Sequence, residues 1–293
     1  MNGEMTMHSI TQPYINQFRT GFLQCILQAI HDDKDLDLYI RKNYVNVYYK
    51  GNSLFKLTYN TEFSYKMYID PKFIVHPIIT SITDTETAQV VVGQIPQIKA
   101  NIIRYGKKSL EIEYEQLIIR ANNRESRTNP EYFIVDRQYA IGKERLDLTG
   151  VYWDRTTRHQ SRQMKPCIFE IKYALNSDLK QIAQQIERYY HAITPNMSDF
   201  TEELTIILRQ RLQLGLYEGS EQRLRAMEKV LISSNIEDLR FVVVLVDYNP
   251  NSALFDEQHL RDLSIKSPIF LLKTGFGMWS KTVKPVKVNP LSA

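Results

Sequence analysis

The sequence predicts an α/β protein in which a mixed sheet is flanked by helices and preceded by a smaller α+β unit. Residues 239–246, LRFVVVLV, form an unbroken apolar run, which is typical of a strand buried at the centre of a sheet. Segments with helical spacing of apolar residues alternate with further strands around this run, as in other α/β proteins. The 293 residues, 43% of them hydrophobic, suffice for one large domain or two modest ones.

Composition limits the compartment and the partners. Lys and Arg number 37 against 33 Asp and Glu, so the formal net charge of +4 suits a polyanionic partner without requiring one. Cys25 and Cys167 are far apart and have no neighbours at zinc spacing, so neither a disulfide framework nor a structural zinc is indicated. The N-terminus lacks a signal-peptide pattern, and no apolar run reaches the roughly 18 residues that cross a bilayer. We therefore expect a cytoplasmic protein that does not enter a membrane.

The first 95 residues are predicted to form an accessory domain. In residues 14–30 the apolar side chains recur at helical spacing, which predicts an amphipathic helix. Residues 38–70 are rich in β-branched and aromatic side chains, and the turn sequence at 50–53 divides them into antiparallel strands. Prolines and a glycine in residues 71–96 indicate an irregular connection and a domain boundary near residue 95.

The predicted N-terminal sheet contains many tyrosines and lysines. Such side chains can stack on bases and hold phosphates. Strands favour Tyr in any case, so an amphipathic outer face of the sheet is the simpler interpretation. The residues concerned are Tyr44, Tyr48, Tyr49, Lys50, Lys56, Tyr59, Tyr65 and Lys66.

Residues 96–293 are predicted to form the main domain, which begins with a long helix over residues 96–122. Its apolar stripe consists of Ile103, Leu110, Tyr114, Leu117 and Ala121. On a helical wheel Glu113 lies at the edge of this stripe, whereas Glu115 points nearly away from it. Glu113 is therefore expected to face the interior of the domain, with Glu115 as the alternative.

Strands and helices then alternate toward the C-terminus. Strands are predicted at residues 132–135, 143–153, 167–173, 239–246 and 269–273. Helices are predicted from residues 176–177 to 193 and at 257–263, and a charged helical insertion is predicted near residues 200–232.

A basic hairpin tip separates the second and third of these strands. It contains Arg155, Arg158, Arg162 and Lys165. Such a run is usually a solvated loop, but beside a nucleic-acid site it can form an arm that contacts phosphates. The sequence leaves both interpretations open.

Three charged residues lie in two successive predicted strands. Because side chains alternate along a strand, Glu170 and Lys172 share one face while their apolar neighbours share the other. Asp147 lies between two leucines, where a carboxylate is costly unless it is paired or bound to a metal. If the strands form a hairpin, Asp147 and Glu170 can share a divalent ion, with the Ile171 carbonyl as a further ligand. Oxygen ligands of this kind favour Mg²⁺ or Mn²⁺ over zinc.

These residues suit phosphodiester hydrolysis. A metal held by carboxylates makes a bound water more acidic and stabilises the charge of the transition state. Lys172 can orient the water, transfer a proton if its pKa falls, or hold the phosphate. Glu113 can hold a metal-bound water or a second ion. In the following helix Gln185 lies at the edge of the apolar stripe and can reach toward the phosphate, whereas Gln184 is turned away; both can also be ordinary surface.

The order of these residues resembles the PD-(D/E)xK nuclease superfamily, in particular its members with a Q-x-x-x-Y helix after the catalytic strand. The matching positions are Asp147, then Glu170-Ile171-Lys172, then Gln185 and Tyr189. The resemblance covers roughly residues 100–275 and implies a restriction-endonuclease-like fold. It also implies that Glu113, Asp147 and Glu170 are metal-associated acids, that Lys172 is the catalytic lysine and that Gln185 is an accessory polar group. The first motif reads Leu-Asp where the superfamily has Pro-Asp.

Other catalytic classes lack their motifs. The six histidines show no zinc-hydrolase spacing, and neither a P-loop nor a Gly-x-Ser-x-Gly motif is present. The sequence therefore predicts a Mg²⁺-dependent nuclease acting on nucleic acid, with DNA as the first expectation and a homodimer if both strands of a duplex are cut. Two alternatives stay open: a catalytically silent nucleic-acid-binding module on the same fold, and a structural or partner-binding protein whose buried acids pair with Lys172.

Overall fold

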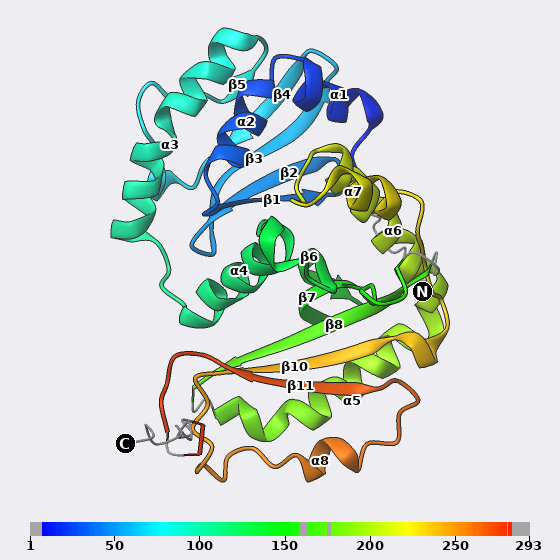
Figure 1. Ribbon diagram of the computed structural model, residues 1–293. Coiled ribbons are helices and arrows are strands. Elements are labelled where there is room, and N and C mark those ends of the chain that lie inside the picture. Colours follow the sequence, from blue (N-terminus) through cyan, green and yellow to red (C-terminus); the bar gives the residue numbers. More distant parts are fainter. Residues whose placement is uncertain (1–7, 159–162, 175–176, 280, 283–293) are drawn as a thin grey trace, which may run out of the picture.

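The chain is a mixed α/β protein with two sheets, each next to its own hydrophobic core. The computed structural model describes residues 8–158, 163–174, 177–279 and 281–282. Figure 1 shows the first sheet and its helices above, in blue and cyan, and the second sheet below, in green to red. No helix within these described residues is both long and apolar enough to cross a membrane.

The first unit is an antiparallel sheet with helices on one face (Figure 1). Its strands, in spatial order, are β1 (Leu36–Arg41), β2 (Tyr44–Tyr49), β3 (Asn52–Thr61), β4 (Ser64–Tyr68) and β5 (Ser81–Ile82). Its helices are α1 (Gln12–Thr20), α2 (Gln24–Asp32) and α3 (Thr85–Tyr105). The predicted sheet is confirmed, but the single helix predicted over residues 14–30 is two helices. The chain breaks at Gly21, whose N–H caps the carbonyls at the end of α1.

The prediction of one long helix over residues 96–122 is wrong in two respects, because the helix starts earlier and is interrupted. An Asp84–Thr87 capping box starts α3 early, and Pro96 lies inside that helix. The chain then breaks at residues 106–109 before α4 (Leu110–Asn123) begins. Residue 95, the predicted boundary, therefore lies within α3, whose Ile95, Ile98 and Ile102 pack in the first core.

The second unit is a mixed sheet with helices on both faces. Its strand order is β11-β10-β8-β7-β6, in which β6, β7 and β8 are antiparallel and β8, β10 and β11 are parallel. The strands are β6 (Tyr132–Ile141), β7 (Glu144–Tyr152), β8 (Gln163–Tyr173), β10 (Arg240–Val246) and β11 (Ile269–Thr274), with the short β9 (Leu231–Ile232) beside β8. The apolar run at 239–246 is the buried strand β10, as predicted. Strand β6 is longer than predicted because it continues through the buried charges Asp136 and Arg137.

Helices cover the second sheet from both sides, with α4 above it and α5 below it in Figure 1. Helix α5 (Ile182–Ile193) follows the short 3₁₀ helix η3 (Ser177–Gln181). The predicted helical insertion corresponds to α6 (Met197–Gln213) and α7 (Glu221–Met227), and α8 (Gln258–Arg261) is shorter than predicted.

The two units are joined by buried contacts. Arg41 of β1 forms an ion pair with Asp136 of β6, and Arg211 Nη1 of α6 donates to the Leu38 carbonyl at 2.7 Å. Tyr39 of β1 packs in the cluster under α4, while Leu214, just after α6, packs in the first core. Packing and polar contacts thus fix the first sheet against the second unit.

Candidate active site

Asp147 and Glu170 lie together where the β7–β8 ladder ends. The last pair of this ladder is Leu148 with Phe169, so the two acids are the next residues on their strands. The Oδ2 atom of Asp147 accepts a hydrogen bond from the backbone N–H of Ile171 at 3.0 Å. The predicted pairing of the two strands is therefore confirmed, and its register places Asp147 and Glu170 opposite each other. The site lies in the carboxyl-terminal half of β8, where Glu170 pairs with Val243 in the middle of β10 and Lys172 pairs with Leu245 near its end.

Two side chains engage the Glu170 carboxylate, which is fully buried. Lys172, two residues along β8 and on the same face, donates from Nζ to Oε1 and forms an ion pair with it. The hydroxyl of Tyr189 on α5 lies 3.0 Å from Oε2. Lys172 is only 6% exposed, so this ion pair is shielded from water.

Burial and mutual repulsion decide the charge states here. Loss of hydration is the largest cause that raises the pKa of Glu170, and the charge of Asp147 adds to it. Burial also raises the pKa of Asp147, against the opposing effect of the Ile171 N–H. Burial alone would lower the pKa of Lys172, but the charges of Glu170 and Asp147 outweigh it and the pKa is raised. Lys172 is therefore a cation, which favours holding an anion or orienting water over proton transfer by a lysine with a lowered pKa.

The acid that α4 directs inward is Glu115. Glu115 is 1% exposed, accepts from Arg137 Nη2 at 2.9 Å, and has its pKa raised to about 7 by burial, with Asp147 adding to the effect. Glu113 is half-buried and lines a small pocket beside Lys34 and Lys50 instead. The expectation that Glu115 points away from the interior is wrong.

The break at residues 106–109 explains this error. The helical wheel treats residues 96–122 as one continuous helix. Because α4 is a separate helix, its orientation is not set by the residues before the break, and its buried face consists of Glu115, Ile119 and Asn123. Leu110 and Leu117, which were assigned to the apolar stripe, are exposed.

Arg137 and Gln138 are parts of this site that sequence reasoning missed. Gln138 Nε2 donates to Glu115 Oε1 at 3.3 Å, and Gln138 has a left-handed backbone with φ of 51°. Neighbouring pairs place Gln138 across the β6–β7 ladder from Asp147. Charged and polar residues inside an otherwise apolar strand were the available signal.

Gln185 faces the site through Tyr189. Gln185 is half-buried and its Nε2 donates to the Tyr189 hydroxyl at 2.6 Å, whereas Gln184 is exposed. The preference for Gln185 over Gln184 is thus supported by geometry. Tyr189 itself, four residues along the same helix face, is the group that touches Glu170.

The basic hairpin tip lies at the other end of the strands. Lys165 pairs with Tyr152, five residues before Glu170 on β8, which is about 17 Å along a strand. Lys165 forms an ion pair with Asp238 at 2.8 Å, and Arg155 is exposed. Arg162 lies outside the described residues.

Arg158 is a structural residue within this tip. Its guanidinium donates to the carbonyls of Trp153 and Pro130 and lies 5.2 Å from the centre of the Trp153 ring. The tip thus does not lie beside the site and Arg158 contacts the protein itself, which favours the first of the two interpretations, a loop, while contact of the tip with nucleic acid stays a prediction.

The donor set for a metal ion is small. In the part of the chain that the structure describes, no group of three or more His, Cys, Asp and Glu side chains is arranged to hold a metal ion. Asp147 and Glu170 provide two adjoining carboxylates, and Mg²⁺ commonly binds through one or two carboxylates while keeping several waters. Two carboxylates lie within the number that Mg²⁺ uses, so binding of Mg²⁺ here, with the Ile171 carbonyl as a further ligand, stays a prediction.

Two surface cavities lie near the second sheet. A groove of about 740 Å³ between α4 and the ends of β10 and β11 is lined by residues that include Tyr114, Leu272 and Phe276. Tyr114 stacks at 5.2 Å on Tyr173, which follows Lys172, so this groove adjoins the site.

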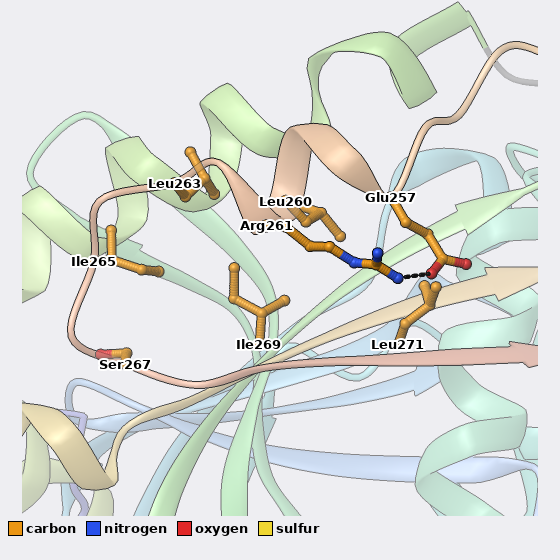
Figure 2. Close-up of a pocket in the computed structure, with 8 residues that line it drawn as sticks. All are labelled: Glu257, Leu260, Arg261, Leu263, Ile265, Ser267, Ile269 and Leu271. Carbon is orange, nitrogen blue, oxygen red and sulfur yellow. Dashed lines mark hydrogen bonds and ion pairs between the residues drawn. The ribbon is translucent and has the colours of Figure 1, made fainter.

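The second cavity, shown in Figure 2, measures about 310 Å³ and lies between α8 and β11. Apolar side chains surround the ion pair of Glu257 with Arg261, and it contains none of the predicted site residues.

No protein-family description matches the chain, and neither the curated proteins nor the solved structures contain a match.

Proposed function

We propose that the protein is a metal-dependent nuclease with a restriction-endonuclease-like fold that hydrolyses phosphodiester bonds, in DNA in the first instance. The main support is the meeting of Asp147, Glu170 and Lys172 at the carboxyl end of β8, in the order and spacing described above. The mixed sheet with helices on both faces is compatible with that fold. The proposal includes a cytoplasmic location and, for cleavage of both strands of a duplex, a homodimer.

Each residue has a part in this proposal. Asp147 and Glu170 would hold Mg²⁺ or Mn²⁺, which when bound makes a water more acidic and offsets charge at the phosphorus. Lys172 would hold a phosphate oxygen or orient the attacking water, since it is charged beside both acids. Tyr189, with Gln185 behind it, would fix the orientation of Glu170.

Cleavage of labelled single- and double-stranded DNA and RNA with Mg²⁺, Mn²⁺ or EDTA tests the proposal. We expect the wild-type protein to cut only with metal, and Asp147→Asn and Lys172→Ala to lose at least about a hundredfold in rate. Asp154→Asn, at the opposite end of the same hairpin, is the control and should cut like the wild type. A wild-type protein that cuts nothing in any metal would refute the enzymatic function.

A catalytically silent nucleic-acid-binding module is the second candidate. The observation that favours it is that Lys172 and Tyr189 already engage both oxygens of Glu170, which leaves this carboxylate satisfied without a cation. Binding without cleavage by the wild type, unchanged in Asp147→Asn, would support this second function.

A further inference from the structure

The sheet of the first unit has two faces of opposite character. Helices α1 to α3 cover one face, and Tyr49, Tyr59 and Tyr65 point to the core on that side. These three tyrosines are therefore packing residues. Strand alternation places the remaining tyrosines and lysines of β2 to β4 on the other face.

We call this other surface the open face. Over β1 it is covered by the second unit, because Tyr39 packs under α4, but over β3 and β4 it reaches solvent. Tyr68 at its outer margin is 59% exposed. The open face consists of Tyr44, Asn46, Tyr48, Ser53, Lys56, Thr58, Lys66 and Tyr68.

The open face is cationic and aromatic. Strands β2, β3 and β4 contain no Asp or Glu, whereas Lys56 and Lys66 lie diagonally on neighbouring strands. Within the described residues no ion pair joins either ammonium to a carboxylate. Lys56 Nζ lies 3.8 Å from the centre of the Tyr44 ring, so a cation and a ring are presented together. Lysines that have no carboxylate partner and lie among aromatic rings are the combination that binds phosphates and bases at once.

The open face leads toward the candidate active site. Tyr48 lies at its inner margin, and the guanidinium carbon of Arg137 is 5.0 Å from the centre of the Tyr48 ring. Arg137 in turn donates a hydrogen bond to Glu115, and the nearby charge of Asp147 contributes to raising the pKa of Glu115. Two buried side chains, Arg137 and Glu115, thus connect the inner margin of this face to Asp147 and Glu170.

We infer that the open face binds single-stranded nucleic acid and presents it to the site, an inference whose second half rests on the proposed nuclease function. Lys56 and Lys66 contact phosphates, and the rings of Tyr44 and Tyr68 stack on bases. The strand must be single because the faces of paired bases are hidden inside a duplex. DNA and RNA share this chemistry, and separate arms of the test distinguish them.

Binding of labelled DNA and RNA oligonucleotides, single-stranded and duplex, measured by fluorescence anisotropy in EDTA, tests this inference in the full-length protein. Lys56→Glu combined with Lys66→Glu should weaken single-strand binding at least about tenfold and lower the slope of log K against log salt by about 1.4, for two lost phosphate contacts. The matched control is Lys229→Glu with Lys266→Glu, which changes the net charge equally at two exposed lysines elsewhere. Equal losses of single-strand affinity in both double variants would show that Lys56 and Lys66 do not contact the nucleic acid.

A second pair of variants tests stacking without changing charge. Tyr68→Ala should weaken single-strand binding about tenfold, while Tyr105→Ala, which removes another exposed tyrosine at the end of α3, should bind like the wild type. Both rings are on the surface, so folding is preserved. Unchanged binding by Tyr68→Ala, or tighter binding of duplex than of single strands, contradicts the inference.

The two proposals fail in different ways. If nothing is cleaved with any metal but the Lys56 and Lys66 reversals still weaken binding, the nuclease function is lost and the binding face stands. If metal-dependent cleavage occurs while these reversals leave binding unchanged, the function stands and the binding face is rejected.

Discussion

Glu115 and Glu113 lie two residues apart on α4 in contrasting surroundings. Glu115 is buried against Arg137, whereas Glu113 is half-buried at a solvent pocket. Removing one partner of a buried ion pair leaves the other charge unpaired, so Glu115→Ala should lower the free energy of unfolding by about 3 kcal/mol. Glu113→Ala should change it by less than about 0.5 kcal/mol. Denaturant titration of the two variants measures this, and equal losses of unfolding free energy would show that the Glu115–Arg137 ion pair does not distinguish Glu115 from Glu113.

Asp37 makes the stability depend on pH. Burial raises its pKa from 3.8 to about 6, although Arg211, Arg137 and a hydrogen bond from Gln116 oppose the shift. Because the folded state binds the proton more tightly than the unfolded state, the contribution of Asp37 is most favourable below about pH 4 and is lost as pH rises through 6.

Asp37→Asn removes this dependence. Relative to the wild type, the variant should gain about 2 kcal/mol of unfolding free energy between pH 4.5 and pH 7. Denaturant titrations of both proteins at the two pH values give the difference. A constant difference at both pH values would mean that Asp37 does not titrate in this range.

At the scale of single elements, strands and helices differ in what their sequences reveal. In β8 successive side chains alternate between the two faces of the sheet wherever the strand begins. The shared face of Glu170 and Lys172 could therefore be predicted from their spacing alone. In α4 the direction of Glu115 depends on where the helix starts, and the break at residues 106–109 was not recognised. The partners of Arg137 come from α4 and β2, distant in sequence, so its role could not be derived from local patterns.

The β7–β8 hairpin tip offers a prediction at this scale. Arg158 donates to main-chain carbonyls and its guanidinium lies near the rings of both Phe133 and Trp153, whereas Arg155 is exposed. Arg158→Ala should therefore destabilise the fold by about 2 kcal/mol, through lost hydrogen bonds from a charged donor. Arg155→Ala should leave the thermal midpoint unchanged. If Arg158→Ala instead melts like the wild type but binds nucleic acid less tightly, the tip is a contact arm after all.

At the scale of the whole molecule, the two units meet at a buried interface, here called the seam, which contains Asp136, Arg41 and His8. Asp136 of the second unit is completely buried and holds both Arg41 of the first unit and, at 3.1 Å, the Nδ1 atom of His8. This seam holds the open face beside the candidate site, so both proposals depend on it. Neither unit buries these charges alone, and we therefore expect the wild-type chain to unfold in a single transition.

Arg41→Met should weaken that coupling, because it leaves Asp136 buried without its main partner at a cost of about 3–5 kcal/mol. Both tryptophans, Trp153 and Trp279, belong to the second unit, so their fluorescence reports the unfolding of that unit. Hydrogen exchange of β1 and β2, measured at the same denaturant concentrations, reports the unfolding of the first unit. The denaturant midpoints of the two units should coincide in the wild type and separate in the variant. Arg188→Met, which breaks an exposed pair with Glu144, is the control and should keep them together. Coincident midpoints in Arg41→Met would show that apolar packing at Tyr39 and Leu214, and not the ion pair, couples the two units.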